Sequence, residues 1–231
     1  MNIKKDFYQS FNITLDLALE AHELLRGDTK QEIQGVREDK EKYENADITT
    51  VTILDDRGAS LLGKQKGIYV TIEAPKMQQN DKTIMSEISQ LLGQKIRLLL
   101  TNLGISQNAS VLLIGLGNWE ATPDSLGPRT IDFSFVTRHL QKYAPGTLPQ
   151  GVRSVSAIAP GVLGITGIET AEIVKGVVDK SQPDVLIAID SLAARNVDRI
   201  CSTIQIADTG IDPGSGIGNQ RIGITKETMG I

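Results

Sequence analysis

The chain has 231 residues, of which 40% are hydrophobic and only 4% aromatic. This length and composition allow one large domain, or one domain with an appended smaller layer, around a core built mainly from Ile, Leu, Val and Ala. The net charge of -4 gives no basic surface for nucleic acid or an anionic membrane. The single cysteine, Cys201, excludes an internal disulfide. No apolar run approaches the roughly 20 residues that span a bilayer. These features predict a cytoplasmic protein.

The first third of the chain predicts one helix and two strands. Residues 15–27 (LDLALEAHELLRG) take on helical spacing of apolar residues and end in a glycine. Residues 28–47 are strongly charged and predict a solvated loop or a poorly ordered segment. Residues 48–54 and 67–74 resemble strands on either side of the turn-prone residues 55–66. We expect these two strands to add an antiparallel ribbon to the main sheet.

Helices and strands alternate from about residue 80 onward. Helices are expected at residues 81–104, 124–143 and 167–181, and apolar strands at residues 109–117, 154–160 and 183–190. Residues 202–208 alternate like a strand nearer an edge. This order predicts an α/β fold with a largely parallel central sheet flanked by helices. The glycine-rich residues 208–231 show no closing helix, so we expect either an unusual completion of the sheet or a shortened chain.

One predicted strand leads into a glycine turn, Gly115-Leu116-Gly117, which matches the start of a dinucleotide-binding loop. The third glycine position of that loop falls on Glu120, whose negative charge would oppose a pyrophosphate. Pro123 interrupts the direct entry into a helix. The sequence therefore disfavours nucleotide binding, and a tight turn at the end of a strand is the simpler interpretation.

Two aspartates follow predicted strands. Asp124 lies seven residues after Gly117 at the expected start of a helix, and Asp190 ends the apolar run DVLIAID. A lone aspartate at a helix start is usually only an N-cap. Ligands of open parallel sheets, however, bind outside the C-terminal ends of the strands, where two acids can face one crevice. A close pair would share a proton and supply the base and the acid that peptide hydrolysis needs. The same oxygens could hold a metal ion, and the sequence does not separate these alternatives.

Other routes to catalysis have less support. Asp208-Thr209-Gly210 is the tripeptide of pepsin-like proteases, but those enzymes need two copies in an all-β frame, so a turn after an edge strand explains Asp208 better. The only histidines are His22 and His139, both in predicted helices. Cys201 is expected to be a small buried residue and not a nucleophile. No histidine–cysteine cluster has the spacing of a zinc site, and we expect no metal and no cofactor.

Four segments together resemble the germination protease of spore-forming bacteria: residues 115–128 (GLGNWEATPDSLGP), 156–170 (SAIAPGVLGITGIET), 187–195 (IAIDSLAAR) and 204–219 (IQIADTGIDPGSGIGN). The resemblance implies an atypical aspartic endopeptidase that degrades small acid-soluble spore proteins at germination, in the forespore or spore core. It implies a fold similar to that of hydrogenase-maturation endopeptidases, and a homotetramer for the full-length family. The catalytic pair that it implies is Asp124 and Asp190, the two acids selected by the sheet argument.

The resemblance also implies a zymogen. Family members remove a short N-terminal propeptide by self-cleavage at a site similar to that of their substrates, approximately Thr-Glu-(Ile/Phe)-Ala-Ser-Glu. Residues 15–20 (LDLALE) are similar, apart from the leucine in place of the threonine. This predicts a propeptide of residues 1–16, cleavage between Asp16 and Leu17, and one protease domain at residues 17–231. Family members continue well past the last residue, so we expect this domain to be incomplete at its C-terminus.

Four further residues are expected near the catalytic pair. Asn118 and Thr122 would position the turn, and Gly214 and Gly216 would line the crevice. Two other functions stay open at this point. A metal-dependent maturation protease acting on one partner protein would lose its activity to a chelator. A non-catalytic binding module would hold a small ligand in the same crevice without turnover.

Overall fold

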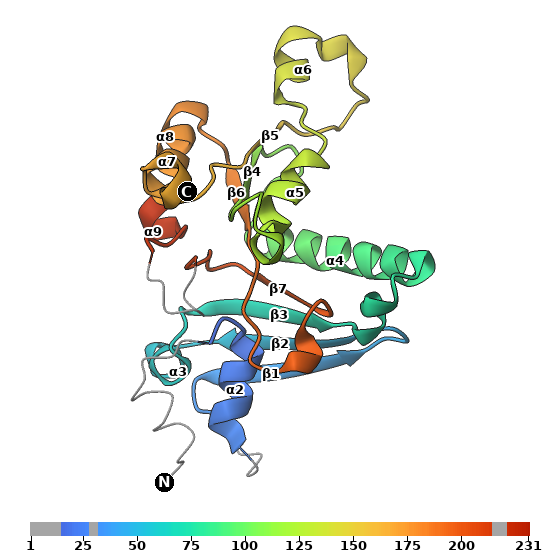
Figure 1. Ribbon diagram of the computed structural model, residues 1–231, viewed down its shortest axis with the longest axis vertical. Helices are drawn as coiled ribbons and strands as arrows, with labels where there is room; N and C mark the ends of the chain where they lie inside the picture. Colours follow the sequence, from blue (N-terminus) through green and yellow to red (C-terminus); the bar gives the residue numbers. More distant parts are fainter. Residues whose placement is uncertain (1–14, 28–31, 214–220) are drawn as a thin grey trace. The chain divides into compact units, whose positions relative to one another are not determined.

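The computed structural model describes residues 15–27, 32–213 and 221–231 (Figure 1). These residues form two compact units. The antiparallel unit comprises residues 15–27, 32–103 and 192–209, and the parallel unit comprises residues 104–191, 210–213 and 221–231. No helix in these described ranges is both long enough and apolar enough to cross a membrane. The single protease domain at residues 17–231 stays a prediction.

The antiparallel unit contains a four-stranded sheet in the order β1-β2-β3-β7. Its strands are β1 (Val36–Lys42), β2 (Asp47–Ile53), β3 (Gly67–Glu73) and β7 (Thr203–Ala207), and each neighbouring pair is antiparallel. The predicted ribbon of β2 and β3 is confirmed, and β7 is an edge strand as expected. The expectation that the ribbon extends the parallel sheet is wrong, because the two sheets share no strand.

Strand β1 corrects the prediction of a loop in the charged residues 28–47. It pairs with β2 in continuous register from Val36 opposite Ile53 to Lys42 opposite Asp47. The ladder of backbone hydrogen bonds holds β1 at the edge of the sheet, where its charged side chains stay in water or form ion pairs. Lys95, for example, lies 2.6 Å from Glu41. A run of charges therefore does not by itself distinguish a loop from an edge strand.

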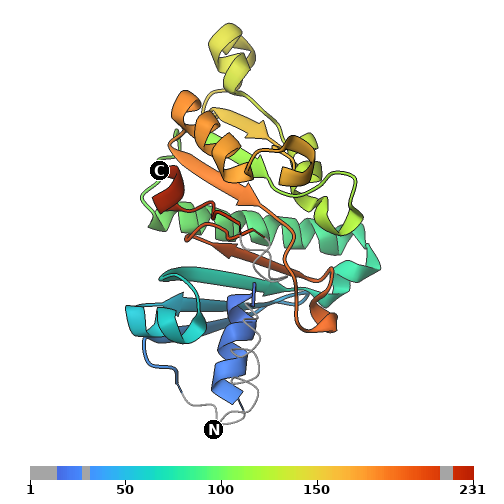
Figure 2. The ribbon, with the colours of Figure 1, turned by 60° about the vertical axis from the view of Figure 1, so that its left-hand side comes forward.

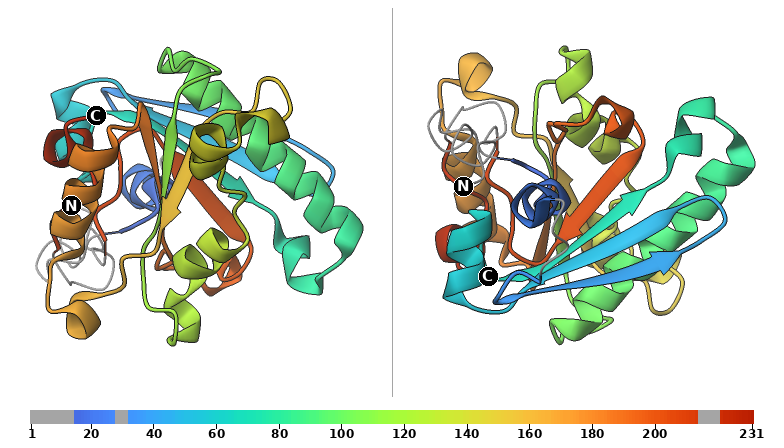
Figure 3. Two further views of the ribbon diagram at one scale, coloured as in Figure 1. Left: turned by 90° about the horizontal axis from the view of Figure 1, so that it is seen from above. Right: turned by 90° about the horizontal axis from the view of Figure 1, so that it is seen from below.

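The central strands of this sheet place apolar side chains on both of its faces, so helices pack on each face. The helix α4 (Lys82–Asn102), begun by the Asp81 cap, packs on the face that carries Ile48, Val70 and Ile72 (Figures 1 and 3). The opposite face packs against α2 (Ala18–Arg26) and α3 (Asp56–Leu62). The predicted helices at residues 15–27 and 81–104 are thus confirmed. Helix α3 replaces the expected turn, since Asp55 caps its start and Leu62 is buried.

The parallel unit contains a three-stranded sheet in the order β5-β4-β6. Its strands are β4 (Val111–Gly115), β5 (Val155–Ile158) and β6 (Val185–Ile189), all parallel. Leu112 and Ile114 point to the face covered by α8 (Thr170–Ser181) and α9 (Lys226–Met229) (Figure 2). The α/β prediction is confirmed for this unit. The sheet is smaller than expected, because four of the seven strands among the described residues pair in the antiparallel unit.

The other face of β4 contacts α5 (Leu126–Asp132), the first part of the helix expected at residues 124–143. That helix is broken and resumes as α6 (Arg138–Tyr143). The break occurs because Thr137 is tied to β5: its hydroxyl donates to Arg153 O at 2.6 Å and accepts from Val155 N at 2.9 Å. The remaining short helical turns are η2 (Pro75–Gln79), η3 (Thr122–Asp124), η4 (Pro145–Thr147), α7 (Leu163–Thr166) and η5 (Val197–Arg199).

Candidate active site

The loop after β4 sets the position of Asp124. Gly117 has φ of +111°, and a Cβ there would lie 2.0 Å from the carbonyl oxygen of Asp124, so only glycine fits. Asn118 N donates a hydrogen bond to Asp124 Oδ2 at 2.8 Å. The N-cap of α5 is Ser125, so Asp124 does not cap this helix. Its carboxylate instead closes the loop between Gly117 and the start of α5.

Asp190 directly follows β6, the parallel neighbour of β4. Its Oδ1 accepts a hydrogen bond from Ser191 N at 2.8 Å. The pairing of the two strands continues past β4, since Leu116 N donates to Ile189 O at 2.8 Å. Asp190 therefore lies at the C-terminal end of β6, where the loop carrying Asp124 leaves β4.

Gly127 brings the segments of the two aspartates together. A Cβ at Gly127 would lie 2.2 Å from Leu116 O and 2.6 Å from Ile189 O, so the first turn of α5 presses against the ends of both strands. Gly127 is three residues after Asp124, and Ile189 directly precedes Asp190. Both carboxylates are partly exposed at this one edge of the parallel sheet. The edge location that the sequence predicted is therefore found, while their catalytic role stays a prediction.

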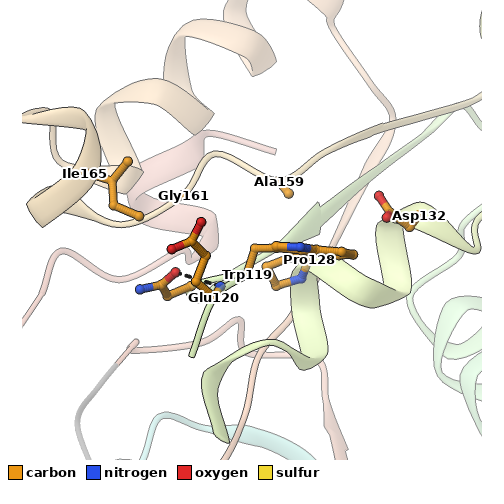
Figure 4. A pocket seen from close by; sticks show the side chains of 9 residues that line it. Trp119, Glu120, Pro128, Asp132, Ala159, Gly161 and Ile165 are labelled. Carbon is orange, nitrogen blue, oxygen red and sulfur yellow. Dashed lines mark hydrogen bonds between the residues drawn. The ribbon is translucent and has the colours of Figure 1, made fainter. Parts of the chain in front are cut away.

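An open hollow of about 320 Å³ adjoins the loop of Asp124 (Figure 4). Gly117 and Asn118 contribute to it directly. Its remaining lining residues are Trp119, Glu120, Pro128, Asp132, Ala159, Gly161 and Ile165. The sequence prediction missed this feature, because the lining comes from two separate segments with no common period. The signal available was the glycine- and proline-rich stretch after β5, which ends at the same edge as β4.

The other residues predicted for the site fall in different places. Asn118 also accepts a hydrogen bond from Glu120 N through its Oδ1 at 3.0 Å, which orders the turn. The backbone oxygen of Thr122 accepts from the Ser125 hydroxyl at 3.1 Å. Gly214 and Gly216 lie outside the described residues. Their predicted place in the crevice stays a prediction.

The predicted cleavage bond lies in the antiparallel unit. Asp16 Oδ2 accepts a hydrogen bond from Ala193 N at 3.0 Å, and Leu17 is only 2% exposed. Ala18 N donates to Gln205 Oε1 at 2.8 Å. The buried Glu20 carboxylate accepts hydrogen bonds from the segment after Asp190: from Arg195 N, Asn196 N and the Arg199 guanidinium. The described residues on both sides of the predicted cleavage bond are thus packed into the antiparallel unit.

Two histidines, one cysteine and a third aspartate are the other candidate nucleophiles or bases in the sequence. His22 is buried beside Glu38, at 3.7 Å, and burial lowers its pKa. His139 is exposed on α6. Cys201 is exposed and has φ of +55° in the turn before β7, so the expectation of a buried residue is wrong. Asp208 Oδ1 accepts a hydrogen bond from Ile68 N at 2.7 Å and so fixes the end of the β3–β7 pair. This agrees with the prediction of Asp208 as a turn residue.

Among the residues that the structure describes, no group of three or more His, Cys, Asp or Glu side chains is arranged to hold a metal ion. Asp124 and Asp190 supply carboxylate oxygens only, with backbone N–H donors on each. This arrangement can take up and release protons at the edge of the sheet, which is the chemistry of general acid–base catalysis.

Comparison with known proteins places these features in a family. The model of the germination protease family (Peptidase_A25) matches residues 16–231. Similar curated proteins are the germination proteases of Clostridium acetobutylicum, 45% identical over 220 residues, and Caldanaerobacter subterraneus, 50% identical over 219 residues. The matches cover 95% of this chain and 67% and 66% of those relatives. The germination protease of Bacillus mycoides is 45% identical over 223 residues, which are 96% of this chain and 60% of that relative.

The chain thus spans about two thirds or less of the length of these relatives. The match begins at the first residue of the predicted cleavage bond and includes the loops of both aspartates. The chain belongs to the germination protease family.

Proposed function

We propose that this protein is an endopeptidase that degrades small acid-soluble spore proteins during germination, with Asp124 and Asp190 as its catalytic pair. The observation that carries this proposal is the close contact of Gly127 with Leu116 O and Ile189 O. That contact brings the segments of two acids, about 65 residues apart in sequence, to one edge of a parallel sheet. Membership of the germination protease family supports the reaction and the substrate class.

In the proposed mechanism one aspartate is ionised and removes a proton from the attacking water. The other is protonated and donates its proton to the nitrogen of the scissile peptide bond. This division requires the two carboxyl groups to approach closely, because like charges at short range resist joint ionisation. The hydrogen bonds from Asn118 N and Ser191 N each hold one carboxylate oxygen, which limits the rotation of each carboxyl group.

The test is the replacement of each aspartate by asparagine in this chain. Asp124→Asn and Asp190→Asn preserve shape but remove the acid–base group, so each should lower kcat for digestion of a purified spore protein by about 100-fold or more. The matched control is Asp179→Asn on the exposed side of α8, which should retain full activity. Circular dichroism checks that all three variants are folded. Full activity in either site variant would overturn the mechanism.

We also propose that the chain is a zymogen that cleaves itself between Asp16 and Leu17. Leu17 is buried and α2 begins one residue later, so the first turn of α2 has to open before this bond can enter an active site. Intact mass measurement and N-terminal sequencing after incubation should show a new start at Leu17 in the wild type and none in Asp124→Asn. A new start at another residue contradicts the assigned bond. The homotetramer that the resemblance implies for the full-length family is a further proposal. Light scattering of the same samples measures how many copies of this chain assemble.

A further inference from the structure

A single side chain binds the main chain on both sides of Leu17. Gln205 lies on β7, and its Nε2 donates a hydrogen bond to Asp16 O at 3.3 Å. Its Oε1 accepts a hydrogen bond from Ala18 N at 2.8 Å. Asp16 O is the carbonyl oxygen of the predicted cleavage bond, and Ala18 N belongs to the next peptide group. The amide of Gln205 therefore spans the main chain at the place where cleavage is proposed.

The same few residues are restrained by further contacts. Ala193 N donates a hydrogen bond to Asp16 Oδ2 at 3.0 Å, and both Leu17 and Ala18 are buried. Leu17 O accepts from Ala21 N at 3.1 Å in the first turn of α2. All of these residues, and Gln205 with them, belong to the antiparallel unit. The bond is thus held closed by contacts within one unit.

A peptide bond held in this way is a poor substrate for any protease. Water has to reach its carbonyl carbon and a proton donor has to reach its nitrogen, so the flanking residues must first leave their packing. When opening and closing are fast relative to cleavage, the rate of cleavage follows the population of the open form. Each hydrogen bond that closes the segment lowers that population by roughly 2- to 10-fold.

Gln205 is suited to hold this segment because it binds only main-chain atoms of it. These atoms are present whatever side chains flank the bond, so the contact is independent of the residue types at the cleavage site. The amide supplies a donor and an acceptor and carries no charge. Both of its hydrogen bonds are partly buried, which limits competition from water.

We propose that Gln205 is a clamp that keeps the Asp16–Leu17 bond closed to cleavage, and that the opening of this clamp limits the rate at which the chain processes itself. The proposal rests on the self-cleavage proposed above and adds to it the residue that controls access to the bond. Gln205 acts through the main chain of the segment, so it is a positioning residue and takes no part in proton transfer.

Hydrogen exchange tests the clamp without requiring cleavage. The background is Asp124→Asn, in which self-cleavage is expected to be blocked, so the segment stays intact. Gln205→Met keeps a side chain of similar length but removes both hydrogen bonds, and the amide of Ala18 should then exchange about 10-fold faster or more. The amides of β2 should exchange as before, because the change is local. The matched control is Gln78→Met, which removes a side-chain hydrogen bond to Ile200 O in the same unit and should leave the exchange of Ala18 unchanged.

The same substitution should accelerate processing in the otherwise wild-type chain. Gln205→Met should form the new start at Leu17 about 10-fold faster or more, as followed by intact mass over time, while Gln78→Met keeps the wild-type rate. Gln205→Glu is a second variant that retains an acceptor for Ala18 N but offers no amide donor to Asp16 O. It should also process faster than the wild type.

Three results would overturn the clamp. The exchange of Ala18 does not change in Gln205→Met; it rises together with that of the β2 amides, which assigns Gln205 to general stability; or processing becomes slower in both Gln205 variants, which assigns Gln205 to assisting the cleavage. A failure of the proposed function gives a different result. If the wild-type chain forms no new start at Leu17, self-cleavage at this bond fails, while the exchange of Ala18 still decides whether Gln205 holds the segment.

Discussion

The two units differ in where they place their charged and apolar groups. The antiparallel unit buries a charge network: Arg199 lies at 3.2 Å from the buried Glu20, 2.7 Å from Glu23 and 2.8 Å from Glu73. Its hydrogen bond with Glu23 raises the pKa of Arg199 above its usual range. In the parallel unit the core under α8 consists of apolar side chains, and the ion pairs among its described residues are partly or largely exposed, namely Lys175–Asp179 and Arg221–Glu169.

The two units also differ in how each holds the position of a loop. The segment after Asp190 is held in the antiparallel unit by hydrogen bonds to buried and partly buried carboxylates. The loop of Asp124 is held by close backbone contact at Gly117 and Gly127, where no side chain fits. The first arrangement depends on charge and the second on shape.

The largest loss of stability is expected for Glu20→Ala. This change removes the one fully buried partner of the Arg199 guanidinium, whose side chain is only 9% exposed, and the acceptor of Arg195 N and Asn196 N. Breaking a buried ion pair in this way costs about 3–5 kcal/mol. Urea denaturation should show that decrease in the free energy of unfolding. Glu23→Ala, at a more exposed partner of the same arginine, should cost no more than about 1 kcal/mol; equal losses would argue against a buried network.

Gly127→Ala tests the dependence on shape. The new methyl group would overlap Leu116 O and Ile189 O and push α5 away from the ends of β4 and β6. A displacement of about 1 Å between catalytic groups can cost about 100-fold in kcat, with about 1–3 kcal/mol of stability. Assays of spore protein digestion and thermal denaturation measure the two effects. The control is Gly176→Ala in α8, where a Cβ meets no atom within 4 Å, and it should be neutral or slightly stabilising.

A smaller effect is expected from His22. Burial lowers the pKa of His22 below 6.5, so the folded state prefers the neutral ring more strongly than the unfolded state does. The stability that this preference contributes is complete above pH 6.5 and is lost as the pH falls toward the lowered pKa. The free energy of unfolding should therefore decrease between pH 7 and pH 5. His22→Gln should make this decrease shallower; an unchanged pH profile would remove His22 as its cause.

The smallest effect is expected at the surface of the parallel unit. Lys175 and Asp179 form an exposed ion pair one turn apart on α8. Exposed pairs of this kind contribute about 0.3–0.5 kcal/mol. Lys175→Met should change the free energy of unfolding by no more than this, and the change should vanish in 1 M salt. A loss above about 1 kcal/mol would show that surface charge also matters to this unit.

The sequence predicted the elements whose pattern is local. The apolar runs of β4 and β6, the amphipathic α4 and the ribbon of β2 and β3 are each recognisable within a single window of residues. The edge position of Asp124 and Asp190 was also predictable, because parallel strands place their C-terminal ends together. The likeness to hydrogenase-maturation endopeptidases stays a prediction.

What the sequence could not predict depends on partners distant along the chain. Strand β1 is stable because β2 pairs with it, which its charged residues do not reveal. The helix at residues 124–143 breaks because Thr137 bonds to Arg153 O and Val155 N. The hollow combines the loop after β4 with the loop after β5, so its shape exists only once both strands pair.

The charged strand β1 has a consequence for the behaviour of the protein in concentrated solution. Its outer side has no neighbouring strand in the described sheet, and an edge strand of this kind can template the addition of another chain. Residues 37–42 of this strand are all charged, and their side chains alternate between the two faces of the sheet along that edge. An incoming apolar strand would have to strip water from these charges, which is costly. The same residues that conceal this strand from a pattern search thus protect the sheet against aggregation.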